Sequence, residues 1–80
     1  MIKLLAIVKL KDNVTDNHGN EILLRLKNSD FNNVNNIKYG KLFTITLDED
    51  DSAKAKQIVE KMCETLLANS YIEEYEVKII

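Results

Sequence analysis

The chain has 80 residues, of which 45% are hydrophobic and 30% charged, and its net charge is −2. This length predicts a single domain, residues 1–80, with the composition of a folded rather than a disordered chain. Arg25 is the only arginine, so the clustered cations of a nucleic-acid-binding surface are not expected. No stretch approaches the roughly 20 apolar residues of a membrane span, and Lys9 and Lys11 interrupt the apolar start before it resembles a signal peptide. The sequence indicates a cytoplasmic protein.

The first half of the chain predicts a strand followed by a helix. Residues 2–11 place apolar side chains at alternate positions, which is typical of a strand packed on a core. After a polar break, Asp16 is the expected N-cap of a helix whose apolar positions are Ile22, Leu23 and Leu26. This helix is expected to end around residues 27–30.

The second half predicts two strands, a helix and a last strand. Residues 35–40 read as a short strand with Gly40 at a turn or bulge, and the alternation of residues 43–47 predicts the next strand. Ser52 is the expected N-cap of the second helix and Asn69 its left-handed stop. The apolar face of that helix comprises Ala55, Ile58, Val59, Met62, Cys63, Leu66 and Leu67. Residues 71–80 alternate again and predict the last strand.

The predicted order is β-α-β-β-α-β, the ferredoxin-like order of an α+β domain. It implies two layers, with two helices on one face of a mainly antiparallel sheet. A four-stranded sheet has open edges and 80 residues give a modest core, so we expect at least a dimer that associates through the sheet.

No residue pattern predicts a site of catalysis, cofactor binding or metal binding. The only histidine, His18, has no orienting partner or neighbouring nucleophile, and it falls in the first turn of the predicted helix. The acidic run 48–51 fits a helix N-terminus better than a hard-metal site. Cys63 is expected to be a small core residue, since it lies on an apolar helix face. Lys41, next to Gly40, is a candidate cationic side chain for binding a partner carboxylate or a phosphate.

Four stretches together resemble the PurS family, the small subunit of the multi-subunit phosphoribosylformylglycinamidine synthase. Its leucine–lysine, valine and aspartate-any-any-glycine pattern is matched by Leu10, Lys11, Val14, Asp16 and Gly19. Its aromatic, valine and aliphatic-basic-any-glycine-lysine pattern is matched by Phe31, Val34, Ile37, Lys38, Gly40 and Lys41. The stretches "MCETLLAN" and "IEEY" are similar to its second helix and last strand. Asn17 and Ser70 stand where the family has proline, and Lys38 replaces a common arginine, which gives up a bidentate contact.

The resemblance implies a non-catalytic subunit of purine biosynthesis. Such a subunit pairs with itself, as a dimer or tetramer, and bridges a glutaminase subunit and a large ATP-dependent synthetase subunit, supporting ammonia transfer between them. ATP, Mg²⁺ and glutamine would be used by the assembled complex and not bound by this chain. The candidate partner interface comprises Lys11, Asp16, His18, Gly19, Gly40, Lys41 and Asn69. The alternative is a free-standing α+β module that binds a small ligand or regulates an enzyme, and independent catalysis ranks third.

Overall fold

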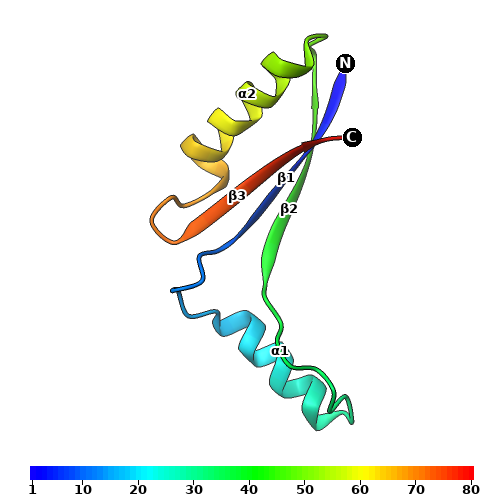
Figure 1. The fold of residues 1–80 in the computed structure, drawn as a ribbon, viewed down its shortest axis with the longest axis vertical. Helices are drawn as coiled ribbons and strands as arrows, with labels where there is room; N and C mark the ends of the chain where they lie inside the picture. Colours follow the sequence, from blue (N-terminus) through cyan, green and yellow to red (C-terminus); the bar gives the residue numbers. More distant parts are fainter.

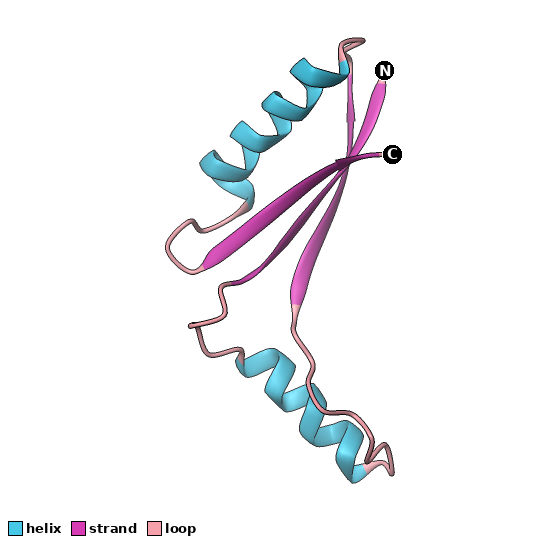
Figure 2. Cartoon of the chain, in the orientation of Figure 1, coloured by secondary structure: helices cyan, strands magenta, loops and turns pink.

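The computed structural model describes all residues from 1 to 80 and contains three strands and two α-helices, in the order β-α-β-α-β. Figure 1 follows the chain and Figure 2 separates helices from strands. The elements are β1 (Ile2–Leu10), α1 (Asn17–Asn28), β2 (Gly40–Leu47), α2 (Ser52–Met62), a π-helical turn η1 (Cys63–Leu67) and β3 (Glu73–Ile79). None of the helices is both long and apolar enough to cross a membrane.

β1 is the central strand of an antiparallel sheet with the order β2-β1-β3. Its register places Ala6 opposite Phe43 of β2 and Val77 of β3. These residues share the inner face of the sheet with Leu4 and Val8, which are fully buried. The alternation seen in the sequence therefore corresponds to one face that builds the core and one polar face.

α2 covers the inner face over β1 and β3. Its buried residues Ala55 and Val59, with Cys63 of η1, follow one helical stripe and join the core cluster. At η1 the helix loosens by one residue, because the N–H of Ala68 bonds the carbonyl of Cys63 at 3.0 Å. As a result Leu67 turns toward the core, whereas Leu66 is 83% exposed.

α1 does not lie on the sheet. It projects beyond the sheet end at which β1 stops and β2 starts, away from α2 (Figure 1). The chain measures 48 × 25 × 14 Å with a radius of gyration of 15.8 Å, against roughly 12 Å for a compact chain of this length. The expectation of two helices on one face of the sheet is therefore wrong for the single chain, because the connection after β1 leads α1 outward.

The predicted strand at residues 35–40 is also wrong as a separate strand. Residues 34–39 have no regular secondary structure. Of the predicted strand 35–40, Gly40 alone lies in a strand, as the first residue of β2. The register explains this: Lys9 already pairs with Gly40, and β1 ends at Leu10, so nothing lies beside the preceding residues to form a ladder. Instead Val34 and Ile37 are half-buried, while their neighbours remain exposed.

Helix ends and turns differ in detail from expectation. Asp16 caps α1 as predicted, but α2 is capped by Asp51, whose side chain accepts from the N–H groups of Ala53 and Lys54, and Ser52 is its first residue. No glycine has a positive φ, and Asp30, after α1, is the only residue that does, at 74°. Asn69 therefore does not adopt the left-handed conformation expected of it, and Gly40, expected at a turn or bulge, is the first residue of β2.

Candidate functional site

The side chain of Asp16 joins two segments that are far apart in sequence. Its Oδ1 accepts a hydrogen bond from the N–H of Gly19 at 2.9 Å, which caps α1, and its Oδ2 accepts from the N–H of Tyr39 at 2.7 Å. These two backbone donors hold the pKa of the Asp16 carboxyl below its usual range, the Tyr39 bond contributing most. Asp16 thus fixes where α1 starts relative to the entry of β2.

Gly19 allows this connection because it has no side chain. A Cβ atom there would lie 2.5 Å from Asp16 Oδ2 and 2.5 Å from the carbonyl oxygen of Ile37. Gly19 is also the only buried residue of α1. The aspartate-any-any-glycine pattern therefore encodes a close approach between the first turn of α1 and the segment that leads to β2.

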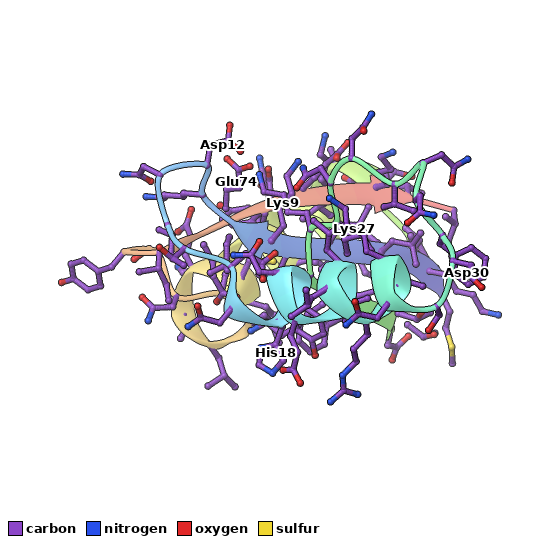
Figure 3. All side chains as sticks on the ribbon, turned by 90° about the horizontal axis from the view of Figure 1, so that it is seen from below. Lys9, Asp12, His18, Lys27, Asp30 and Glu74 are labelled. Atoms are coloured by element: carbon purple, nitrogen blue, oxygen red, sulfur yellow. The ribbon has the colours of Figure 1, made fainter.

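His18 stacks on Tyr39. The ring centroids are 4.7 Å apart and the planes are inclined by 24°. His18 lies on the opposite side of α1 from Asp12, Lys9 and Glu74 (Figure 3). Its imidazole has no hydrogen-bond partner, so the structure gives it a packing contact rather than a proton-transfer relay.

An ion pair links the loop after β1 to the same entry segment. Lys38 bonds the carboxylate of Asp12, which lowers the pKa of Asp12 and raises the pKa of Lys38. Both residues line a polar hollow of about 440 Å³ beside α1, together with Asn13, Asp16, Asn20 and Asn36. The charged and amide side chains that line this hollow can form hydrogen bonds with polar groups.

Lys41 is bound inside the chain and does not project from a turn. Its Nζ donates to the carbonyl of Leu67 at 3.3 Å and lies 3.3 Å from Oε2 of Glu73. Glu73 is 13% exposed at its side chain, and its Oε1 accepts from the N–H of Asn69 at 2.7 Å. Asn69 in turn accepts from the N–H of Tyr71 through its Oδ1 at 3.1 Å. Lys41 therefore ties β2 to the connection between α2 and β3.

Lys11 closes the same end of the sheet. Its Nζ donates to the carbonyl of Ser70 at 2.9 Å, and its backbone N–H donates to the carbonyl of Ile72 at 2.8 Å. At the same end of the sheet, position 40 has no room for a side chain. A Cβ atom on Gly40 would lie 2.8 Å from the carbonyl oxygen of Val8.

All seven candidate interface residues gather where β1 ends and β2 and β3 begin. We call this region the junction: Lys11, Asp16, His18, Gly19, Gly40, Lys41 and Asn69. The sequence did not place Tyr39, Glu73 or Asp12 among the candidate interface residues, although they complete the hydrogen bonds and ion pairs of the junction. Spacing gave no signal for them, because they meet residues 23 to 32 positions away.

The acidic run 48–51, Cys63 and Tyr75 lie outside the junction. Asp51 of the acidic run 48–51 caps α2, and no group of three or more His, Cys, Asp or Glu side chains is arranged to hold a metal ion. Cys63 is buried as expected, and burial raises the pKa of its thiol. Tyr75 donates to Glu64 at 3.0 Å, which raises the pKa of the phenol.

Comparison with known proteins gives matches over nearly the whole chain. Residues 3–80 match the family model "PurS: Phosphoribosylformylglycinamidine (FGAM) synthase". The phosphoribosylformylglycinamidine synthase subunit PurS of Methanocaldococcus jannaschii is 38% identical over 99% of this chain and 95% of its own length, and that of Bacillus subtilis is 33% identical over 99% and 93%.

Solved structures agree with these matches. The crystal structure of M. jannaschii PurS superposes with a TM-score of 0.91 at 39% identity, covering 100% of this chain and 96% of that one. A chain in the structure of PurLQS from Thermotoga maritima superposes with a TM-score of 0.89 at 33% identity, covering 100% and 99%. The similarity thus includes the projecting α1 and is not confined to the sheet.

Proposed function

The chain belongs to the PurS family of phosphoribosylformylglycinamidine synthase subunits, and from this premise we propose that it is the non-catalytic small subunit that bridges the other two. The observation that carries the proposal is the full-length likeness to a chain of PurLQS, an assembly of PurS with PurL and PurQ. In this proposal the chain contributes surface and geometry, while the partners contribute the reacting groups.

The proposed reaction divides between two partner subunits. A glutaminase subunit releases ammonia from glutamine, and a synthetase subunit uses ATP with Mg²⁺ to activate formylglycinamide ribonucleotide, which then accepts the ammonia. This chain binds none of these cofactors in the proposal. It holds the two partners together, which keeps the ammonia route closed, and a cytoplasmic location is part of the same proposal.

Self-association is the second part of the proposal. Only 8 of the 80 residues are buried, and α1 carries Ile22 and Leu24 with 40% and 62% of their surface exposed. A helix so poorly covered gains little from tertiary packing, which is the usual source of helix stability. A second copy of the chain would supply the missing cover, since small domains bury a low share of their surface alone.

The junction is the proposed contact surface for the larger subunits. Its backbone and most of its polar side chains already have partners within the chain, so its geometry is set before assembly. What it offers to another protein is the outer side of the His18–Tyr39 stack and the half-exposed side chain of Lys41. A preorganised surface loses little entropy when it binds.

The test is reconstitution with the glutaminase and synthetase subunits of the same organism. Co-purification of the three proteins, with glutamine-dependent formation of the amidine product only when this chain is present, is the expected result. A two-subunit mixture that makes the product from glutamine equally well without this chain would refute the bridging role. Ammonium chloride in place of glutamine is the control, because the synthetase then needs no ammonia transfer.

A further inference from the structure

The turn between α2 and β3 carries the most exposed large apolar side chain of the protein. Tyr71 is 90% exposed, more than Leu66 or Met1, which are both 83% exposed. Figure 1 shows this turn projecting from the molecule on the side away from β2. Single exposed apolar residues are common on protein surfaces and need no partner. The exposure of Tyr71 is informative because of the backbone that carries it.

Hydrogen bonds within the turn fix its shape. The carbonyl of Asn69 accepts from the N–H groups of Ile72 and Glu73, at 3.0 and 2.7 Å. The Asn69 side chain accepts from the N–H of Tyr71 at 3.1 Å, and the N–H of Asn69 donates to Oε1 of Glu73 at 2.7 Å. Asparagine is well suited to such a turn because its side chain can bond the backbone two residues on. Residues 69–73 thus form one closed, hydrogen-bonded turn.

Two lysines from neighbouring strands fasten the turn to the sheet. Lys11, directly after β1, donates through its Nζ to the carbonyl of Ser70 at 2.9 Å. Lys41 of β2 donates to the carbonyl of Leu67 at 3.3 Å. The position of the turn relative to the sheet is therefore set before any partner binds, and a preorganised group loses little entropy on binding.

The outward groups of this turn have no partner within the chain. We call Ser70, Tyr71 and Ile72 the tip. The Tyr71 hydroxyl makes no hydrogen bond, and neither the carbonyl of Tyr71 nor the N–H of Ser70 is bonded. A tyrosine side chain has two rotatable bonds, so its immobilisation costs little entropy, and tyrosine is enriched among the residues that dominate binding energy at interfaces. The tip thus offers a ring, a hydroxyl, a backbone donor and a backbone acceptor on a rigid support.

Lys11 gives the tip a positive rim. It takes part in no ion pair, unlike Lys9 and Lys41, and its ammonium lies against the carbonyl of Ser70. A carboxylate at the edge of a pocket that accepts Tyr71 would complement this charge. A second copy of the chain does not, because a two-fold contact through the tip would place one Lys11 near the other.

We propose that Tyr71 is an aromatic anchor that inserts into a pocket on one of the two larger subunits. The pocket has apolar walls, a hydrogen-bonding group for the phenol, and a carboxylate at its rim that pairs with Lys11. This inference rests on the proposed bridging function and supplies a contact residue for it. The tip continues the junction, because Lys11 and Asn69 of the junction hold it in place.

The affinity of the chain for its partners tests the anchor. The chain is titrated into a mixture of the glutaminase and synthetase subunits, and glutamine-dependent product formation is followed. We expect Tyr71→Ala to raise the half-saturating concentration by about tenfold or more and to leave turnover at saturation unchanged. Ile80→Ala is the matched control, since Ile80 is 63% exposed and follows the opposite end of β3; it should behave as the wild type. Circular dichroism would verify that both variants fold.

The rigidity of the tip is tested at Asn69. Asn69→Ser keeps a side-chain oxygen that can accept from the N–H of Tyr71, whereas Asn69→Ala removes it. Because Tyr71 itself is present in both, we expect the alanine variant to need a higher half-saturating concentration than the serine variant. Equal values for the two would overturn the preorganised anchor.

The rim charge is tested by salt. Lys11→Met should weaken the salt dependence of the half-saturating concentration, because charges at an interface rim act mainly on encounter. An unchanged salt dependence would remove the carboxylate from the proposed pocket.

A photoreactive residue identifies what covers the tip. With benzoylphenylalanine in place of Tyr71, illumination of the assembled complex should cross-link the chain to one larger subunit. A cross-link to a second copy of the chain, or a Tyr71→Ala variant with the half-saturating concentration of the wild type, would overturn this inference while leaving the bridging function standing. A wild-type chain that produces no glutamine-dependent rate at any concentration would defeat the bridging function itself.

Discussion

Asp16 and Tyr39 are joined by a 2.7 Å hydrogen bond from a backbone N–H to a carboxylate across 23 residues of sequence. The same carboxylate caps α1 through Gly19. One side chain therefore determines both where the helix begins and how the chain enters β2. This bond fixes the direction in which α1 leaves the sheet, and with it the elongated shape of the molecule.

Replacing Asp16 with asparagine should remove a pH-dependent part of the stability. Because the pKa of Asp16 is lowered in the folded chain, its contribution is complete above the unfolded pKa of about 3.9 and is lost as the pH falls through the lower, folded value. We expect Asp16→Asn to melt at lower temperature than the wild type at pH 7, with the gap shrinking below about pH 4. Melting followed by circular dichroism from pH 7 to pH 3 measures this.

The control for this measurement is Asp48→Asn. Asp48 is exposed and makes neither a hydrogen bond nor an ion pair through its side chain. Its substitution should leave the melting temperature nearly unchanged across the same pH range. An equal loss in both variants would mean that net charge, and not the Asp16 contacts, sets the pH dependence.

Gly19→Ala should destabilise the fold although alanine is the better helix former. The added Cβ would meet the carbonyl oxygen of Ile37 at 2.5 Å, and crowding of this kind costs about 1–3 kcal/mol, against a gain of about 1 kcal/mol in helix propensity. Urea unfolding of Gly19→Ala beside Asn20→Ala, an exposed neighbour on the same helix, separates the two effects. If both alanines stabilise the chain, the close approach at Gly19 is not a constraint.

His18→Ala should leave the rate of the reconstituted complex nearly unchanged. A catalytic base typically contributes about 10²-fold or more, and His18 has a stacking contact with Tyr39 but no proton-transfer partner. We expect the same turnover at saturating substrates and a small loss of stability of about 0.5–1.5 kcal/mol from the lost stack. A hundredfold slower turnover in a fully assembled complex would require a chemical role for this residue.

Lys41→Glu should weaken the fold as well as any contact with the larger subunits. The substitution removes the bond to the Leu67 carbonyl and places a carboxylate beside Glu73, so we expect a loss of about 1 kcal/mol. Lys41→Met loses the charge without the repulsion and should melt higher than Lys41→Glu.

The contact role of Lys41 is tested separately from its effect on stability. Gel filtration with the partner subunits at low and moderate salt should detect weaker assembly of Lys41→Met, because rim charges act mainly on encounter and salt sensitivity. Normal assembly of this variant at both salt concentrations would restrict Lys41 to holding β2 against the α2–β3 connection.

The sequence by itself determined the local elements and the family. Alternation identified β1, the later part of β2 and β3. Three-and-four spacing identified α2 and the following turn η1 with its buried Cys63, and Asp16 was recognised as a cap. These features depend on neighbours a few residues apart, which a single sequence displays. Collinear motifs along the whole chain were enough to indicate the family, which the matches over residues 3–80 confirm.

Only the tertiary structure decided how α1 and residues 34–39 are used. The pattern predicted a fourth strand and a second helix on the sheet, but both depend on what lies beside them in space. β1 ends at Leu10 and offers no ladder to residues 34–39, and the Asp16–Tyr39 bond turns α1 away from its own sheet. Likewise Lys41 looked free in the sequence and is held by Leu67 and Glu73 in the fold. Long-range hydrogen bonds decide these placements, and their partners are 23 to 32 residues apart, beyond the reach of any local pattern.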